Sequence, residues 1–199
     1  VPDTKWKLRN IGRGWVLGET LISGIGQGYF QSTPIQLCLM MAQFANGGYE
    51  VEPKIIDDRI KISNIGLKRL YKNQENIKFV LDALYGATNE PMGTSYRSRL
   101  NKPEYVYAGK TGTSQTRTIT KEERELKLKS KDLPYKKRDH ALFTAFAPYK
   151  QPRYSISIVI EHGGTGSSAA APIAKKVIKK VLDRHQLRKK YQWDLFREA

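Results

Sequence analysis

The sequence predicts an α+β fold, an antiparallel sheet with flanking helices. Three strand-like segments follow one another in the second half of the chain, at residues 105–113, 141–147 and 154–161. Helical segments precede the first strand, and a lysine-rich helical segment follows the last. Successive strands with helices grouped before and after them are typical of this class. Hydrophobic residues make up 39% and charged residues 27% of the 199 positions, the balance of an ordinary globular domain.

The first part of the chain is expected to be irregular up to its first helix. Residues 1–31 are rich in glycine and show no sustained period, so we expect irregular structure packed down by its tryptophans. The hydroxyls and proline of residues 32–34 begin a helix. Residues 35–44 continue it with apolar side chains almost all round, the pattern of a buried helix. The Asn-Gly-Gly run at 46–48 ends it.

Alternation and helical periodicity predict the next two elements. Residues 49–55 alternate apolar and charged side chains, which predicts a short strand. Residues 75–87 are expected to form a second helix, because their apolar side chains recur on one face. That face consists of Ile77, Val80, Leu81 and Leu84. Residues 57–74 show a weaker pattern and are expected to hold short strands and a turn of helix.

The second half of the chain is expected to form the sheet and a covering helix. The segment 141–147 is apolar on both faces, as in a central strand, and 154–161 alternates isoleucine with serine. The final helix has Pro172 near its first turn. Its apolar stripe is expected to lie on the sheet and consists of Ile173, Val177 and Val181. Its opposite side is expected to face water and carries Lys175, Lys176, Lys179 and Lys180.

The chain is strongly basic, with a formal net charge of +16. Residues 175–199 carry nine basic and three acidic side chains, and residues 121–138 carry eight basic and four acidic ones. Such a field favours anionic partners: nucleic acid, acidic lipid headgroups or anionic wall polymers. The plainer interpretation is the solvated surface of a basic protein. The net charge makes a basic module that binds nucleic acid or an anionic membrane the alternative function. The sequence shows no groove-reading helix, arginine comb or aromatic platform, and this counts against that alternative.

Several kinds of site are excluded by composition. Cys38 is the single cysteine, which excludes an intrachain disulfide and a cysteine zinc site. The richest apolar run, residues 37–42, is far shorter than the ~20 residues of a membrane span. The three histidines are too dispersed to predict a metal site, and we expect no metal and no cofactor. The chain opens at Val1 in a polar stretch without a signal-peptide pattern, so we expect it to be part of a longer protein.

The most informative string is Ala-Gly-Lys-Thr-Gly-Thr-Ser-Gln at residues 108–115. A strand interior disfavours two glycines unless something must approach the backbone closely. Lys110 supplies a fixed cation, and Thr111 and Thr113 supply hydroxyls. Gly112 leaves the backbone between them open. Together these residues suit a carboxylate beside an edge strand, and the alternative is a glycine- and threonine-rich turn without a ligand.

The same string resembles the third motif of penicillin-binding proteins and serine β-lactamases. Shorter strings extend the resemblance over nearly the whole chain, most weakly at residues 57–74 and 116–138. They are Trp6-Lys7-Leu8-Arg9, Gly18-Glu19-Thr20, Gly24-Ile25-Gly26-Gln27-Gly28-Tyr29, Thr33-Pro34-Ile35-Gln36-Leu37, Ala45-Asn46-Gly47-Gly48, Asp139-His140-Ala141-Leu142-Phe143 and Ala147-Pro148. Together they resemble the class B penicillin-binding proteins of the penicillin-binding protein 2 group.

This resemblance implies a β-lactamase/transpeptidase-like fold and a peptidoglycan D,D-transpeptidase. Such an enzyme forms a serine acyl-enzyme with a stem peptide, expels the terminal D-alanine and passes the acyl group to an amine. The resemblance implies that Lys110 supports proton transfer beside a serine of a second motif. Thr111 and Thr113 would bind the carboxylate of the substrate or of a β-lactam, and the Thr113 N–H would donate to the oxyanion. Gly112 would leave the approach open.

Strand alternation adds a constraint on this arrangement. Side chains alternate between the two faces of a strand, so Lys110 and Gly112 lie on one side and the two threonines on the other. The site must therefore straddle the edge of the strand rather than lie over one face.

The sequence also departs from the family pattern. No serine is followed three positions later by lysine, and no Ser-x-Asn occurs. We therefore expect residues 1–199 to be the C-terminal part of a transpeptidase domain, with the nucleophile, the second motif and a membrane anchor upstream. Residues 1–199 alone are expected to be inactive.

The resemblance also implies partners and a location. Peptidoglycan stem peptides and β-lactams are the expected ligands, and a membrane glycosyltransferase of the elongation machinery is the expected partner. No nucleic acid is expected. The expected location is the periplasmic face of the bacterial inner membrane. Whether residues 1–199 self-associate through an exposed sheet edge stays open at this point.

Overall fold

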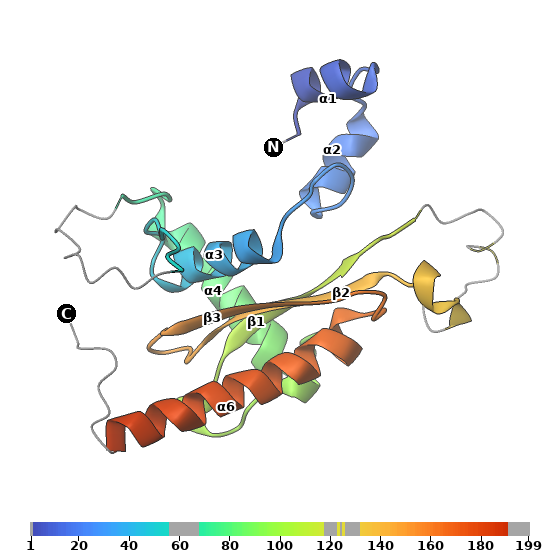
Figure 1. The fold of residues 1–199 in the computed structure, drawn as a ribbon. Helices are drawn as coiled ribbons and strands as arrows, with labels where there is room; N and C mark the ends of the chain where they lie inside the picture. Colours follow the sequence, from blue (N-terminus) through green and yellow to red (C-terminus); the bar gives the residue numbers. More distant parts are fainter. Residues whose placement is uncertain (1, 56–67, 118–122, 124, 126–131, 191–199) are drawn as a thin grey trace. The chain divides into compact units, whose positions relative to one another are not determined.

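The computed structural model describes residues 2–55, 68–117, 123, 125 and 132–190 (Figure 1). Two compact units divide the chain, Val1–Thr33 and Pro34–Ala199. The helices are α1 (Thr4–Ile11), α2 (Leu17–Gly24), α3 (Pro34–Ala45), α4 (Gln74–Asn89) and α6 (Ala171–Lys190). The strands are β1 (Ala108–Ser114), β2 (His140–Ala147) and β3 (Tyr154–Ile160). In this described part of the chain, no helix has the length and apolar character to cross a membrane.

The first unit contains two helices, so the irregular structure predicted for residues 1–31 is wrong. α1 begins after Asp3, whose carboxylate accepts a backbone hydrogen bond at 2.6 Å. It ends at Gly12, whose φ of 73° is a left-handed conformation that glycine adopts without strain. α2 begins after Val16, whose N–H donates to the Glu19 carboxylate at 2.8 Å. Each helix has eight residues, too few turns for a hydrophobic period to emerge, so capping groups define both.

An ion pair links the two helices of the first unit. The buried Lys7 ammonium contacts the Glu19 carboxylate, and the Tyr29 hydroxyl donates to the same carboxylate at 3.1 Å. The hydrogen bond from Lys7, aided by a backbone N–H and by Tyr29, holds the pKa of Glu19 below its usual value. The rings of Trp6 and Trp15 pack on Tyr29, with centroid distances of 5.6 and 6.4 Å. The tryptophans therefore pack this unit as predicted.

The second unit is built on a three-stranded antiparallel sheet in the order β1-β2-β3. β2 is the central strand, as its two apolar faces predict, and its Leu142 stands opposite Gly112. β1 begins at Ala108 rather than at residue 105. The preceding residues Pro103–Tyr105 form a 3₁₀ turn, for which the fixed φ of proline is well suited.

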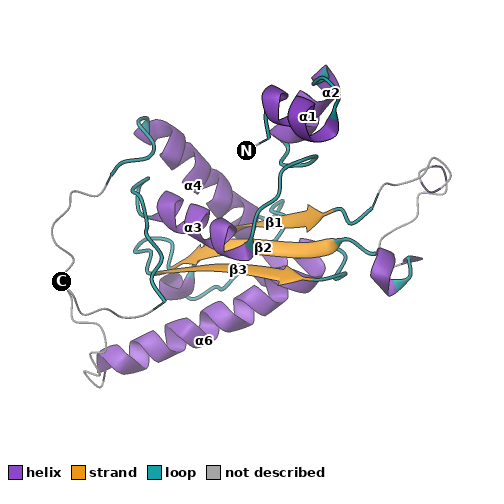
Figure 2. Ribbon diagram, turned by 45° about the horizontal axis from the view of Figure 1, so that its top comes forward, coloured by secondary structure: helices purple, strands orange, loops and turns teal. Residues whose placement is uncertain are grey.

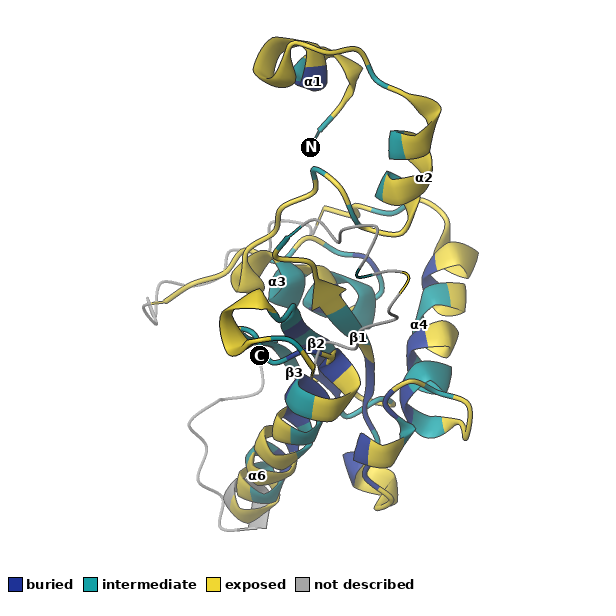
Figure 3. Cartoon of the chain, turned by 90° about the vertical axis from the view of Figure 1, so that its right-hand side faces the viewer, coloured by how far each residue is buried: buried dark blue, intermediate teal, exposed yellow. Residues whose placement is uncertain are grey.

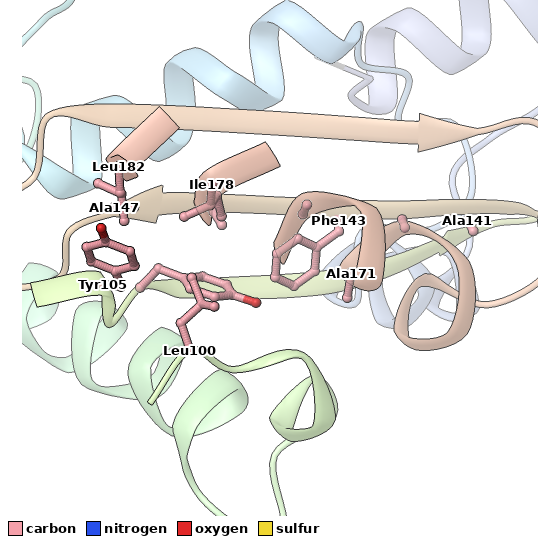
Figure 4. Close-up of a cluster of buried hydrophobic side chains, with 12 residues drawn as sticks. Leu100, Tyr105, Ala141, Phe143, Ala147, Ala171, Ile178 and Leu182 are labelled. Atoms are coloured by element: carbon pink, nitrogen blue, oxygen red, sulfur yellow. The ribbon is translucent and has the colours of Figure 1, made fainter. Parts of the chain in front are cut away.

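Helices cover both faces of this sheet, α6 on one and α3 with α4 on the other (Figure 2). On the α6 face, alternate residues of β2 pack with the inner side of α6 (Figure 4). The larger members of this core are Tyr105, Tyr107, Phe143, Ile178 and Leu182. The opposite face has a smaller core of buried residues, which consists of Met41, Leu84, Ala108 and Phe146.

The side of α6 that faces the sheet is not the one predicted. Ile173 and Val177 are 41% and 40% exposed. The buried stripe recurs every three or four residues and consists of Ala171, Ala174, Ile178 and Leu182 (Figure 3). Alanines on β2 and on α6 let the two surfaces approach closely, and a pattern that weights large side chains misses them. The lysines expected to face water do so at 176, 179 and 180, whereas Lys175 is half-buried.

Two further sequence predictions are wrong. α3 is not buried all round, because Met41 is buried but Ile35 is 56% exposed. Residues 49–55 do not form a strand in the described chain, where this stretch makes one isolated bridge. A single bridge leaves most of its backbone without the ladder that a strand requires. The predictions for residues 57–74 fall largely outside the described residues.

Candidate active site

β1 carries the Lys-Thr-Gly-Thr string at an edge of the sheet. It pairs with β2 along one side, with Ala108 opposite Phe146 and Ser114 opposite His140. Along its other side, no strand within the described residues pairs with it. The string therefore lies on an edge strand of this part of the chain, as the sequence predicts.

The end of α4, the helix predicted at residues 75–87, fixes the first half of β1. The hydroxyl of the fully buried Thr88 donates to the Gly109 carbonyl at 3.2 Å and accepts from the Gly109 N–H at 3.1 Å. The Asn89 side chain donates to the Tyr107 carbonyl at 2.9 Å. These side chains take the place of a neighbouring strand and satisfy backbone groups that burial would otherwise leave unpaired. The backbone is thus held immediately before Lys110.

The hydrogen bonds to Thr88 also show which way the backbone groups of β1 point. In an antiparallel ladder the N–H and C=O of one residue point to the same side, and that side alternates along the strand. Gly109 directs both groups toward Thr88, on the edge away from β2. Thr111 and Thr113 therefore direct theirs to the same edge. This includes the Thr113 N–H, to which the resemblance gives the role of oxyanion donor.

The four side-chain positions of the motif divide between the two faces of the sheet. Residues paired across strands share a face, so the register places Lys110 and Gly112 on the face covered by α3 and α4. Thr111 and Thr113 lie on the α6 face. This is the division expected from strand alternation.

Lys110 and Thr111 nevertheless meet at the edge of the strand. The Lys110 ammonium donates to the Thr111 carbonyl at 2.9 Å and lies 3.4 Å from the Thr111 hydroxyl. That hydroxyl donates in turn to the hydroxyl of Thr94 at 3.1 Å. The Lys110 cation thus reaches the edge from the α3/α4 face and the Thr111 hydroxyl reaches it from the α6 face, an arrangement that suits a carboxylate.

A cleft of about 280 Å³ opens beside Lys110 on the face covered by α3 and α4. Its other walls are mainly apolar and include Met40, Phe44, Val80 and Leu142. Apolar walls keep the local dielectric low, so the ammonium attracts an anion in this cleft more strongly than it would in open water.

The two glycines of the motif have different structural causes. A Cβ on Gly109 would lie 2.6 Å from the Thr144 carbonyl oxygen and 2.7 Å from the Ala145 Cβ. Packing within the sheet therefore explains Gly109, and no ligand is needed. A Cβ on Gly112 would meet only the Leu142 Cβ, at 3.3 Å, inside the cleft. Gly112 thus keeps the cleft wide at the motif.

The described residues do not place a nucleophile at this edge. Among them, the Lys110 ammonium donates to Thr111 alone, and no serine hydroxyl contacts it. No cluster of three or more His, Cys, Asp or Glu side chains in the described chain is placed to hold a metal.

Sequence reasoning missed Thr88 and Thr94, the two hydroxyls that contact the motif from outside it. Thr88 lies in the last turn of α4 and Thr94 in the loop after it, 17 positions before Thr111. The available signal was the Gly-Thr-Ser run at residues 93–95, where small and hydroxyl-bearing residues follow a helix. Such runs are common in turns, so this run alone does not distinguish hydroxyls that contact the motif from ordinary turn residues.

The sequence profile of the penicillin-binding protein transpeptidase domain matches residues 3–179 of this chain. The chain belongs to the penicillin-binding protein transpeptidase family. Among curated members, the peptidoglycan D,D-transpeptidase MrdA of Salmonella typhimurium is 33% identical over 191 residues, which cover 92% of this chain and 30% of that protein. MrdA of Haemophilus influenzae is 31% identical over 189 residues, covering 89% of this chain and 28% of the relative.

Solved structures of this family have the same fold. Penicillin-binding protein 2 of Helicobacter pylori, solved in complex with MreC, matches with a TM-score of 0.75 and 30% identity over 92% of this chain and 30% of that one. Penicillin-binding protein 2 of Pseudomonas aeruginosa, solved in complex with WCK 5153, matches with a TM-score of 0.72 and 33% identity over 92% of this chain and 38% of that one. The predicted β-lactamase/transpeptidase-like class is confirmed. The chain spans about a third of the length of these relatives.

Proposed function

We propose that this chain supplies the carboxylate-binding edge of a peptidoglycan D,D-transpeptidase. The single observation that supports this most directly is the convergence of the Lys110 ammonium and the Thr111 hydroxyl on an edge strand. Curated relatives that match about nine-tenths of the chain carry the name of that activity. An edge strand with a fixed cation can hold the anionic end of an extended peptide beside it.

In the proposed reaction the stem peptide lies along the edge of β1 that points away from β2. Thr111 and Thr113 bind its terminal carboxylate, and the Thr113 N–H donates to the oxygen of the carbonyl under attack. Lys110 supports proton transfer at a serine hydroxyl, and Gly112 leaves room for the peptide. A donor aimed at the developing oxyanion stabilises the transition state more than the ground state. β-Lactams would bind at the same edge through their own carboxylate.

The serine nucleophile, the second motif and a membrane anchor are proposed to lie in a preceding part of the protein. The proposed location is the periplasmic face of the inner membrane, beside a membrane glycosyltransferase of the elongation machinery. A partner of the MreC kind fits this proposal, because a relative with the same fold was solved in complex with MreC.

The test compares three proteins for covalent labelling by a fluorescent penicillin. The complete protein should be labelled, and residues 1–199 alone should not be, because a missing nucleophile costs several orders of magnitude in rate. Lys110→Ala in the complete protein should lower the acylation rate at least 100-fold, whereas Lys150→Ala in the exposed turn after β2 should leave it unchanged. A denaturation-resistant adduct on residues 1–199 alone, or unchanged acylation of Lys110→Ala, would contradict the proposal.

A further inference from the structure

A second, larger groove lies beside the motif on the α6 side. It has a volume of about 760 Å³ and runs between the loop at residues 91–98 and the segment 167–179. No carboxylate side chain lines it among the described residues, but four cations do. They are Arg97, Lys175, Lys176 and Lys179.

Three of these four cations are unpaired within the described chain. Lys179 donates to the Asp183 carboxylate at 2.7 Å, one helical turn further along α6. Arg97, Lys175 and Lys176 make no hydrogen bond or ion pair with any described residue. Like charges gathered without counter-ions repel one another. A bound anion would remove that cost, so the groove is electrostatically complementary to a ligand with several negative charges.

The groove adjoins the carboxylate-binding edge of β1 through Thr94. Thr94 lines it and accepts the hydrogen bond from the Thr111 hydroxyl at 3.1 Å. Its other wall begins at Ser167, and the preceding Gly166 lies directly on Gly112, since a Cβ on Gly166 would be 2.7 Å from the Gly112 carbonyl oxygen. Ser168, two residues later, adds an exposed hydroxyl to the lining. The groove therefore begins at the threonine side of the motif, away from the Lys110 side chain.

The dimensions of the groove fit a short extended peptide. The stretch of α6 from Ala171 to Lys179 rises roughly 12 Å, at 1.5 Å per residue. This is the length of about four residues of extended chain. Lys175, Lys176 and Lys179 fall within a little more than one turn, so they can reach carboxylates on neighbouring residues of such a peptide.

We infer that this groove binds the acceptor peptide, a short peptide with several carboxylates whose amine receives the acyl group. The inference rests on the proposed function above. There, the terminal carboxylate of the donor lies at Thr111 and Thr113, so its terminal residue leaves from the threonine side. The amine that replaces it enters from the same side, where the groove begins.

The transfer step then balances without a further reactant. The amine nitrogen of the acceptor bonds to the acyl carbon, and the ester bond to the serine oxygen breaks. The proton that the amine loses returns to the serine oxygen. The cations of the groove hold the carboxylates of the acceptor, and their positive field favours the neutral, nucleophilic form of its amine over the ammonium form.

The experiment separates acylation from transfer in the complete protein. One variant removes two groove cations, Lys175→Gln with Lys176→Gln, and its matched control removes two exposed lysines outside the groove, Lys150→Gln with Lys180→Gln. A fluorescent penicillin measures acylation. Transfer is measured from a synthetic stem-peptide donor to two acceptors, one with free carboxylates and the same peptide with its carboxylates amidated.

The groove variant should raise the KM for the acceptor with free carboxylates about tenfold or more. Its KM for the amidated acceptor and its acylation rate should stay within about twofold of those of the unsubstituted protein. The control should leave all three unchanged. An unchanged KM in the groove variant overturns the inference, as does a loss of acylation parallel to the loss of transfer. Unchanged transfer with weakened binding of duplex DNA would assign the groove to nucleic acid and likewise overturn it. If the unsubstituted protein is not acylated at all, the proposed function itself fails.

Discussion

The two halves of β1 differ although they belong to one strand and pair with the same neighbour. Ala108 and Gly109 are buried, and their backbone is held by β2 on one side and by Thr88 on the other. From Lys110 onward the residues are half-buried or exposed, and the face of this half covered by α3 and α4 opens into a cleft. The comparison shows how a rigid segment can present a functional one. The first half fixes the direction of the strand. The second half continues in that direction, and its side chains are accessible.

Substituting the two glycines of the motif is the strongest way to break this comparison. Gly109→Ala should destabilise the second unit by about 3 kcal/mol or prevent folding, because its Cβ would lie within 3 Å of the Thr144 carbonyl and the Phe143 ring. Gly112→Ala should cost about 1 kcal/mol or less, since it meets only Leu142 at 3.3 Å. Urea unfolding followed by circular dichroism measures both. Equal losses for the two variants would show that the halves are packed alike.

Removing the Thr88 hydroxyl tests the anchor itself. Thr88→Val keeps the shape of the side chain but leaves the buried N–H and C=O of Gly109 without their partner, which should cost about 2 kcal/mol. Thr88→Ser keeps the hydroxyl and should recover most of that loss. Hydrogen exchange of the Gly109 amide should quicken in the valine variant and stay slow in the serine variant. Slow hydrogen exchange of the Gly109 amide in both variants would mean that β2 alone holds the first half of β1.

The first unit provides a contrast in the pH dependence of stability. The pKa of Glu19 is lowered in the folded state, chiefly by its hydrogen bond from Lys7, so its stabilisation is fully present above the ordinary pKa of a glutamate. It should be lost as the pH falls from about 5 through the lowered pKa. Fluorescence of Trp6 and Trp15 in a Trp193→Phe background measures this acid transition.

Glu19→Gln should weaken the first unit at neutral pH and flatten its acid response, whereas the exposed control Glu52→Gln should keep the original profile. Amide signals of β1 should not follow this transition, because Glu19 belongs to the other unit. An acid response that is unchanged in Glu19→Gln would assign it to another carboxylate.

The elements that the sequence predicted well are those with a local signal. β2 is apolar on both faces, α4 repeats its apolar side chains on one face, and the motif has an unusual composition for a strand. α1 and α2 had no such signal, since their caps and the Lys7–Glu19 pair define them. The inner side of α6 was missed for a different reason. Alanines confer little hydrophobic weight in a sequence pattern but permit the closest approach to the alanines of β2.

The sequence by itself determined the family, the edge-strand character of the motif and the alternation of Lys110 and Gly112 with the two threonines. These follow from residue types and from the two-residue period of a strand, which are local properties. Only the tertiary structure decided that Thr88 anchors Gly109, that Thr94 receives the Thr111 hydroxyl, and that the cations of α6 line a groove beginning at the same place. Those contacts join segments 17 or more positions apart, and the packing of helices on the sheet, rather than any spacing along the chain, sets them.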